Sequence, residues 1–201
     1  MTSSPSETET TPHPLQEYAD RVAGVVGGTA EITFDTIKVK VPSEQWSSVH
    51  ERARDDLGLI FFSWLSAVDW TDEVAVGDPP GGDVTDHFEL LSTLGDVSEG
   101  RRVTFSAELS KESPSVASLV PVFAGANWHE REAAEMFGID FDGHPDLSHL
   151  YLPDSFIGNP LRKSYPLLSR EVKPWPGTVD VEGMPGSGPE PTEPSEENPE
   201  A

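Results

Sequence analysis

Apolar residues in the first third of the chain recur with helical spacing, then alternate, then return to helical spacing. Residues 15–26 place five apolar side chains on one face and are followed by two glycines, so a helix is predicted there. Residues 31–41 alternate apolar and polar, with a slip near Thr36 and Ile37, which indicates a strand or a hairpin. A second helix is predicted after Pro42, with Ser43 as its candidate cap and Gly58 as its end.

The middle of the chain is typical of strands. Residues 59–68 form a mixed apolar run, for which we predict a strand with a turn at Asp69. Residues 77–83 have the composition of a loop. Residues 87–94 and 102–109 are predicted to be paired strands joined by a turn at 95–100, and the second of them alternates apolar and polar side chains throughout.

Two further helix starts are predicted downstream. Ser113 and Pro114 are typical of a cap followed by proline at the first helical position, which predicts a helix over 115–123. Asn127 is expected to open another helix, with Glu130 completing an approximate capping box and Gly138 closing it. Beyond Ile139 the chain is rich in proline and glycine and has little periodicity.

These elements predict an α+β fold, a small mixed β-sheet packed with helices and followed by an extended, irregular C-terminal arm. We expect a disordered tail at 1–14, an α/β domain at 15–126, a helix and extended arm at 127–176, and a disordered acidic tail rich in Pro and Gly at 177–201. The 162 residues between the tails are enough to bury a core without a metal or a disulfide.

Charge and cysteine content exclude several classes of protein. A formal net charge of −23 argues against binding to nucleic acid or directly to an anionic membrane surface. The absence of cysteine excludes disulfides and iron–sulfur clusters held by this chain. Neither a signal peptide nor a membrane-spanning run is predicted, so we expect any membrane association to go through partners.

Residues 128–166 carry the chain's densest candidate chemistry. His129, Glu130, Glu132 and Glu135 are potential metal ligands, but their spacing is not H-E-x-x-H and makes no closed ligand set. The same acids, with His144, are the candidates for acid/base or metal groups in a free-standing enzyme. Arg131 and Glu135 are four residues apart, so an ion pair within the helix is also open.

The rest of this segment has many large apolar residues without a helical or strand period. Such an arm either packs back on its own domain or lies on another protein, and we favour the second interpretation. Four basic residues follow it, Arg162, Lys163, Arg170 and Lys173. They suggest docking on an acidic surface, although pairing with the chain's own acids is equally open.

The order E-R-E-x-x-E-M-F-G-I-x-F-x-G-H-P-x-L, then L-P-D, then G-x-P-L-R-K-x-Y-P resembles the signature of the C subunit of NADH-quinone oxidoreductase, the 30 kDa subunit family of respiratory complex I. The usual pattern is altered at four places, six residues in all: Glu135 replaces an Asp, Ser148-His149 replaces two basic residues, Ser155-Phe156 replaces an acid–aromatic pair and Ser164 replaces an Asp. The motif residues, which we expect to form the partner interface, are Glu130, Arg131, Glu132, Glu135, Phe137, Gly138, Gly143, His144, Pro145, Pro153, Asp154, Gly158, Pro160, Leu161, Arg162, Lys163, Tyr165 and Pro166.

The resemblance implies a non-catalytic subunit in the peripheral arm of a proton-pumping NADH:quinone oxidoreductase. Such a subunit binds no cofactor or metal itself, while FMN and iron–sulfur clusters lie on partner subunits. It packs against the large quinone-site subunit and the cluster-carrying subunits, on the cytoplasmic side of the bacterial plasma membrane. The alternative is the equivalent subunit of a membrane-bound hydrogenase-type complex, and a separate subunit is expected rather than a fused one. Arg131 and Arg162 are expected to be the most sensitive positions, through bonds to carboxylates of the arm or of a partner.

Overall fold

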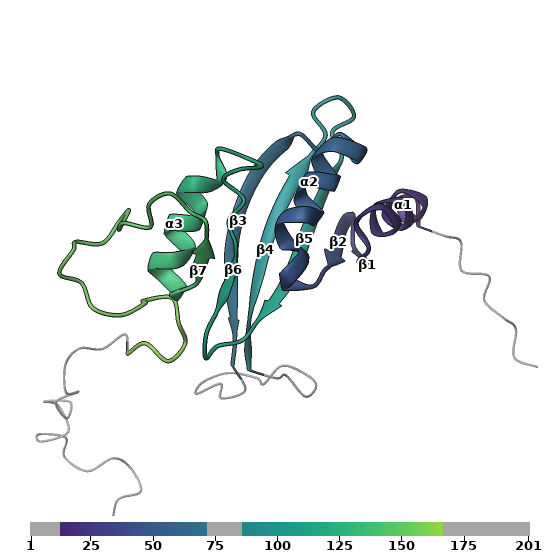
Figure 1. Ribbon diagram of the computed structural model, residues 1–201. Coiled ribbons are helices and arrows are strands. Elements are labelled where there is room, and N and C mark those ends of the chain that lie inside the picture. Colours follow the sequence, from purple (N-terminus) through teal and green to yellow (C-terminus); the bar gives the residue numbers. More distant parts are fainter. Residues whose placement is uncertain (1–12, 72–85, 167–201) are drawn as a thin grey trace, which may run out of the picture. The chain divides into compact units, whose positions relative to one another are not determined.

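The computed structural model describes residues 13–71 and 86–166. Three α-helices, one 3-10 turn and seven strands make up this part of the chain (Figure 1). In chain order they are α1 (Gln16–Val26), β1 (Thr29–Thr33), β2 (Thr36–Lys40), η1 (Ser43–Gln45), α2 (Trp46–Leu57), β3 (Phe61–Trp70), β4 (His87–Gly95), β5 (Arg102–Leu109), β6 (Ser115–Ala117), α3 (Ala126–Phe137) and β7 (Asp140–Asp142). The predicted tail at 177–201, nearly all of the predicted tail at 1–14, the loop at 77–83 and the end of the predicted arm, with Arg170 and Lys173, lie outside the described residues.

A five-stranded mixed sheet forms the centre of the domain, in the order β1-β2-β5-β4-β3. β1 and β2 form the predicted antiparallel hairpin, and β2 continues the sheet by pairing in parallel with β5. β5 pairs antiparallel with β4, and β4 with β3, with an irregular register between Phe62 and Trp64. A separate two-stranded sheet joins β6 to β7 in parallel. The predicted α+β class with a small mixed sheet is confirmed.

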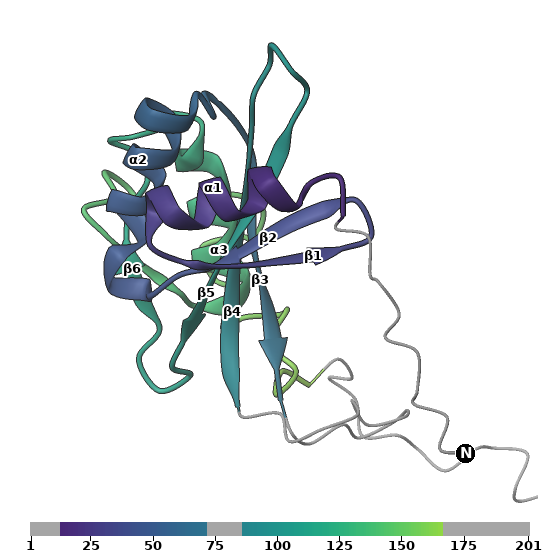
Figure 2. The same ribbon diagram turned by 90° about the vertical axis from the view of Figure 1, so that its right-hand side faces the viewer.

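The helices gather on one face of this sheet (Figures 1 and 2). α1 lies over the hairpin of β1 and β2, while His50 of α2 bonds to Ser92 of β4. Phe137 of α3 packs edge-on against Phe88 of β4, with ring centroids 6.2 Å apart. Phe88 and Ser92 are four residues apart on one strand and therefore share a face. The apolar core lies between this face and the three helices.

A polar network lies on the opposite face of the sheet, around Glu89. The Glu89 carboxylate forms an ion pair with Lys38 of β2 and accepts hydrogen bonds from Ser106 Oγ at 2.6 Å and Trp70 Nε1 at 2.9 Å. Burial raises the pKa of Glu89, but Lys38, Ser106 and Trp70 outweigh it and hold the pKa below its usual value. The acid is thus satisfied by cross-strand neighbours.

The helices near 15–26 and 43–57 and the hairpin near 31–41 were predicted correctly, but other details were wrong. Ser43 does not cap α2: it begins the 3-10 turn η1, and Gln45 stands at the N-cap of α2 without a side-chain bond. The chain does not turn at Asp69: β3 continues to Trp70, and the Asp69 carboxylate is bound from outside the strand. No helix follows Pro114, because residues 115–117 pair with β7 and the Pro114 carbonyl accepts the Asp140 N–H at 2.8 Å. That pairing also places a short strand in the segment predicted to be irregular.

Candidate functional site

Helix α3 is built around two buried carboxylates. Its apolar face points to the sheet through Ala126, Ala133 and Phe137, whose spacing follows one side of a helix. Glu130 and Glu135 are buried as well, with exposed fractions of 0% and 5%. Buried acids require hydrogen-bond donors. In α3 these donors come from the chain segment that precedes the helix and from the segment that follows it.

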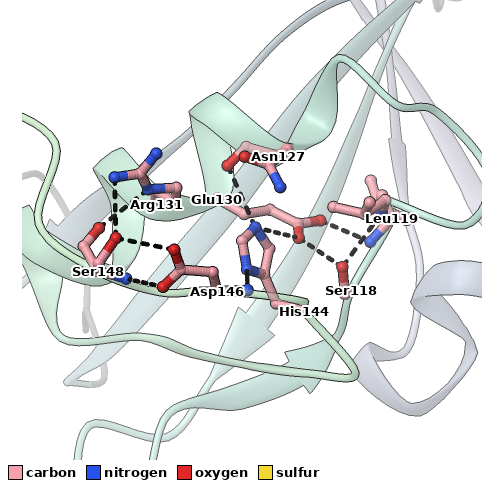
Figure 3. Close-up of polar contacts among 9 residues, drawn as sticks. Ser118, Leu119, Asn127, Glu130, Arg131, His144, Asp146 and Ser148 are labelled. Carbon is pink, nitrogen blue, oxygen red and sulfur yellow. Dashed lines mark hydrogen bonds and ion pairs between the residues drawn. The ribbon is translucent and has the colours of Figure 1, made fainter.

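Glu130 binds the connection between β6 and α3 (Figure 3). Its carboxylate accepts hydrogen bonds from Ser118 Oγ at 2.6 Å and from the Leu119 N–H at 2.5 Å. The predicted capping box is therefore wrong: the side chain reaches residues before the helix, and Gly125 stands at the N-cap. The contact ties the first turn of α3 to the end of β6.

Burial governs the charge of Glu130. It raises the pKa of this carboxyl to about 7, although the bonds from Ser118 and Leu119 act in the lowering direction. Nε2 of His144, also fully buried, lies 3.9 Å from Glu130 Oε2. Because His144 Nδ1 accepts the Asp146 N–H, its ring proton sits on Nε2 and faces the Asn127 carbonyl at 3.2 Å.

Glu135 binds the arm directly. Its two oxygens accept the backbone N–H groups of three successive arm residues, Leu150, Tyr151 and Leu152, at distances from 2.5 to 3.3 Å. Burial by itself would raise the pKa of Glu135, but these three donors lower it below its usual value. An ionised Glu135 thus orders the arm beside α3 mainly through backbone N–H donors.

Arg131 binds the same stretch of arm from the neighbouring side of the helix (Figure 3). Its guanidinium donates to the carbonyl oxygens of Ser148 at 2.9 Å and His149 at 2.8 Å, and to Ser148 Oγ at 3.1 Å. Among the described residues Arg131 bonds to carbonyls and a hydroxyl rather than to the expected carboxylate, and the expected bond to a partner's carboxylate stays a prediction. Arg131 and Glu135 instead bind adjacent parts of the arm backbone.

The arm then closes the carboxyl end of α3. Arg162 donates to the carbonyl oxygens of Phe137 at 2.5 Å and Gly138 at 3.3 Å, and its guanidinium lies over the Phe88 ring. Asn159 Nδ2 donates to the Glu135 carbonyl, and the Leu161 N–H donates to Met136. The last carbonyl groups of a helix have no N–H partner within the helix. Arm residues supply the hydrogen-bond donors for these carbonyls.

One more contact joins the arm to the sheet. The Lys163 N–H donates to Asp69 Oδ2 at 2.8 Å, and Lys111 pairs with Asp69 Oδ1 at 2.5 Å. Burial acts to raise the pKa of Asp69, but its bonds from Lys111, Lys163 and Thr71 keep it below the usual value. The arm is thereby fixed to the end of β3, and its described part to Tyr165 belongs to the same compact unit as the sheet.

Although the arm packs on its own domain, it leaves large apolar side chains uncovered. We call these the arm face: Trp128, Tyr151, Ile157 and Leu161, with exposed fractions from 52% to 87%. A second exposed set lies at the turns before β2 and β5 and at the start of β3: Phe34, Ile60, Phe61 and Val97.

The predicted site residues thus separate into groups. Glu130 and His144 meet, whereas Glu132 is partly exposed and Glu135 binds the arm, so the four residues of the enzyme alternative are not assembled around one point. Gly143 and Gly158 adopt left-handed backbone in the arm's turns, and Gly158 adjoins the Tyr165 ring. Among residues 13–71 and 86–166, no three His, Cys, Asp or Glu side chains are placed to hold a metal. No helix in these ranges has the length and apolarity to cross a membrane.

Comparison with known proteins decides the family. Residues 39–171 match the model of the family described as "Respiratory-chain NADH dehydrogenase, 30 Kd subunit". The chain belongs to this family. It is 33% identical over 165 residues to the NADH-quinone oxidoreductase C subunit of Methylobacterium sp. (strain 4-46), a match that covers 81% of this chain and 72% of that protein. The C subunit of Mycolicibacterium gilvum is 32% identical, over 76% of this chain and 68% of the other.

A fused relative and two solved structures complete the comparison. The NADH-quinone oxidoreductase C/D subunit of Chromohalobacter salexigens is 42% identical over 107 residues, which cover 53% of this chain and only 17% of that protein. The trypsin-resistant fragment (1-134) of Nqo5 has the same fold, with a TM-score of 0.52 and 22% identity over 66% of this chain and 98% of that fragment. An archaeal membrane-bound sulfane sulfur reductase structure also shares the fold, with a TM-score of 0.56 and 17% identity over 76% of this chain and 86% of that one.

Proposed function

We propose that this chain is a non-catalytic subunit of a respiratory NADH:quinone oxidoreductase that stabilises the quinone-reducing module by docking through its arm face. The observation that carries the proposal is the arrangement of α3 and the arm. Glu135, Arg131 and Arg162 hold an aperiodic segment firmly in place, while Trp128, Tyr151, Ile157 and Leu161 remain exposed. Large apolar side chains that stay exposed on an ordered segment are typical of a protein-binding surface.

The fused relative supports the identity of the partner. The protein from Chromohalobacter salexigens is named as a C/D subunit, and this chain matches 17% of its length. A fusion brings two polypeptides together permanently, which is favourable when they already associate. The large quinone-site subunit is therefore the proposed neighbour of the arm face, with the cluster-carrying subunits beside it, on the cytoplasmic side of the membrane. In this proposal FMN and the iron–sulfur clusters lie on the partners.

Affinity purification of the tagged full-length chain from solubilised membranes tests this function. Recovery of the flavin, cluster and quinone-site subunits in stoichiometric amounts, as identified by mass spectrometry, is the expected result. Recovery of a hydrogenase or sulfur-reducing complex would assign the chain to a related assembly. This outcome is considered because the archaeal reductase structure shares the fold. A chain that elutes alone and shows its own turnover would refute the proposal.

A further inference from the structure

Within the part of the chain that the structure describes, no Lys or Arg side chain pairs with Glu130. From the β6–α3 connection it is contacted by a hydroxyl and an N–H, and from the arm by the His144 imidazole. Arg131, on the same helix, points to Ser148 and His149, and Asp146 is bonded to Ser148. On α2, which packs against β6, Arg54 donates to the Val122 carbonyl, and on β7 Asp140 and Asp142 are exposed.

The arm reaches Glu130 through the His144 ring. Nδ1 of this ring accepts the Asp146 N–H at 3.1 Å, a contact that shapes the turn leading to Ser148 (Figure 3). The same turn presents the Ser148 and His149 carbonyls to Arg131. A negative charge on Glu130 would lie in a buried site where no Lys or Arg of the described residues pairs with it, which disfavours the charged form beside the arm.

We propose that Glu130 and His144 form a proton-linked clasp, in which a neutral Glu130 holds residues 143–149 of the arm against α3 and a charged Glu130 weakens that hold. The shift of the Glu130 pKa to about 7 places the transition near neutral pH. Opening of the clasp admits water, so the carboxyl ionises in the open form at lower pH than in the closed form. Rising pH then favours opening until Glu130 ionises in the closed form as well. This inference concerns the arm's attachment to its own domain and does not depend on the docking partner.

Hydrogen exchange of the full-length chain, read by mass spectrometry from pH 5 to 8, tests the clasp. After correction for intrinsic exchange, we expect the protection of peptides covering 143–149 to fall about tenfold or more from pH 5 to 7 and to level off above it. Peptides from β4 and β5 report whether the fold as a whole responds. In Glu130→Gln, which keeps the shape and stays neutral, protection of 143–149 is expected to be independent of pH.

The matched control is Glu132→Gln, two residues along α3 and partly exposed, which is expected to retain the wild-type profile. The proposal is overturned by a wild-type arm whose corrected protection does not change with pH, whatever the variants do. A Glu130→Gln chain that folds, by circular dichroism, and keeps the wild-type pH profile would overturn it equally. The wild-type measurement stands alone if that variant does not fold.

Discussion

Arg162 Nε lies 2.5 Å from the carbonyl oxygen of Phe137, so a side chain 25 residues further along the chain binds the carboxyl end of helix α3. The same guanidinium lies 5.2 Å from the centre of the Phe88 ring, on the sheet. The guanidinium of Arg162, an arm residue, thus contacts both helix α3 and the sheet. The motif G-x-P-L-R-K places this arginine directly after residues that bond to the same helix end, through Asn159 and Leu161.

Replacement of Arg162 by alanine is expected to destabilise the chain by about 1–3 kcal/mol, because two bonds from a charged donor to helix-terminal carbonyls are lost. Arg162→Lys should be intermediate, since an ammonium cannot reproduce the planar fork. Urea unfolding measures both free energies. Arg102→Ala, at an exposed position of β5, serves as the control and is expected to change the free energy of unfolding little. An equal effect of the two alanine variants would contradict the role assigned to Arg162.

Gly138 allows a direct test of how closely the arm approaches α3. Its φ is +70°, and a Cβ there would lie 2.5 Å from Arg162 Nη2 and 2.7 Å from Asn159 Oδ1. Gly58 ends α2 with the same φ, but a Cβ there meets nothing within 4 Å. Gly58→Ala should therefore cost only the backbone strain, roughly 1 kcal/mol. Gly138→Ala should cost more, because two arm side chains must move off the helix end. Matching unfolding free energies would show that the arm does not pack as described.

Local sequence signals predicted the elements whose stabilising contacts are local. The helices at α1 and α2 have one-sided apolar faces and glycine ends, and the β1–β2 hairpin shows an alternating pattern broken at its turn. The motif also contains Arg131, Glu135 and Arg162, which join the arm to α3. Its sequence did not reveal the chemistry of the two arginines: among the described residues, both bond to carbonyls rather than to carboxylates.

The errors arose where tertiary contacts override local preference. Ser113 and Pro114 have the local features of a helix start, but pairing with β7, more than twenty residues away, makes the following residues a strand. Glu130 has the spacing of a capping box, yet Ser118 and Leu119 offer it donors inside the core. Asp69, Ser118 and Asn159 were missed as arm or helix anchors. Single polar residues of this kind carry no periodic signal.

Glu135→Gln is expected to loosen residues 150–152 while the sheet stays folded. The carboxylate accepts three backbone N–H bonds, and a neutral amide offers one oxygen and weaker acceptance, so about 1–3 kcal/mol of arm stability should be lost. Hydrogen exchange of peptides covering 150–152, compared with those of β4, measures the effect. Because its three N–H donors lower the Glu135 pKa in the folded state, this contribution fades as pH falls below the ordinary range of a carboxyl. Unchanged protection of 150–152 in the variant would be inconsistent with this anchor.

His50 is expected to make the fold sensitive to acid. Burial lowers its pKa from 6.5 to about 4, although its Nδ1–H bond to the Trp46 carbonyl acts in the opposite direction. The unfolded chain therefore binds more protons than the folded chain between pH 6.5 and 4. The free energy of unfolding should fall through that window by up to about 3 kcal/mol. His50→Gln should remove this slope in urea unfolding measured at pH 7 and pH 4.5. The raised pKa of Glu130 makes the free energy of unfolding fall as pH rises from 4.5 to 7, opposite to the effect of His50. The two His50 forms are therefore best compared in the Glu130→Gln background, where this opposing contribution is removed.

The docking role predicts that single exposed residues of the arm face control assembly without affecting the fold. Ile157 is 87% exposed, so Ile157→Asp should leave the free energy of unfolding nearly unchanged. Burial of a new carboxylate at the contact should weaken association by about 2 kcal/mol or more, which is roughly 30-fold. Val97→Asp, at a 70% exposed position in the turn before β5, provides the matched control and should assemble normally. Native gels of solubilised membranes and their NADH:quinone activity report the outcome. Loss of assembly in Val97→Asp with an intact complex in Ile157→Asp would move the interface away from the arm face.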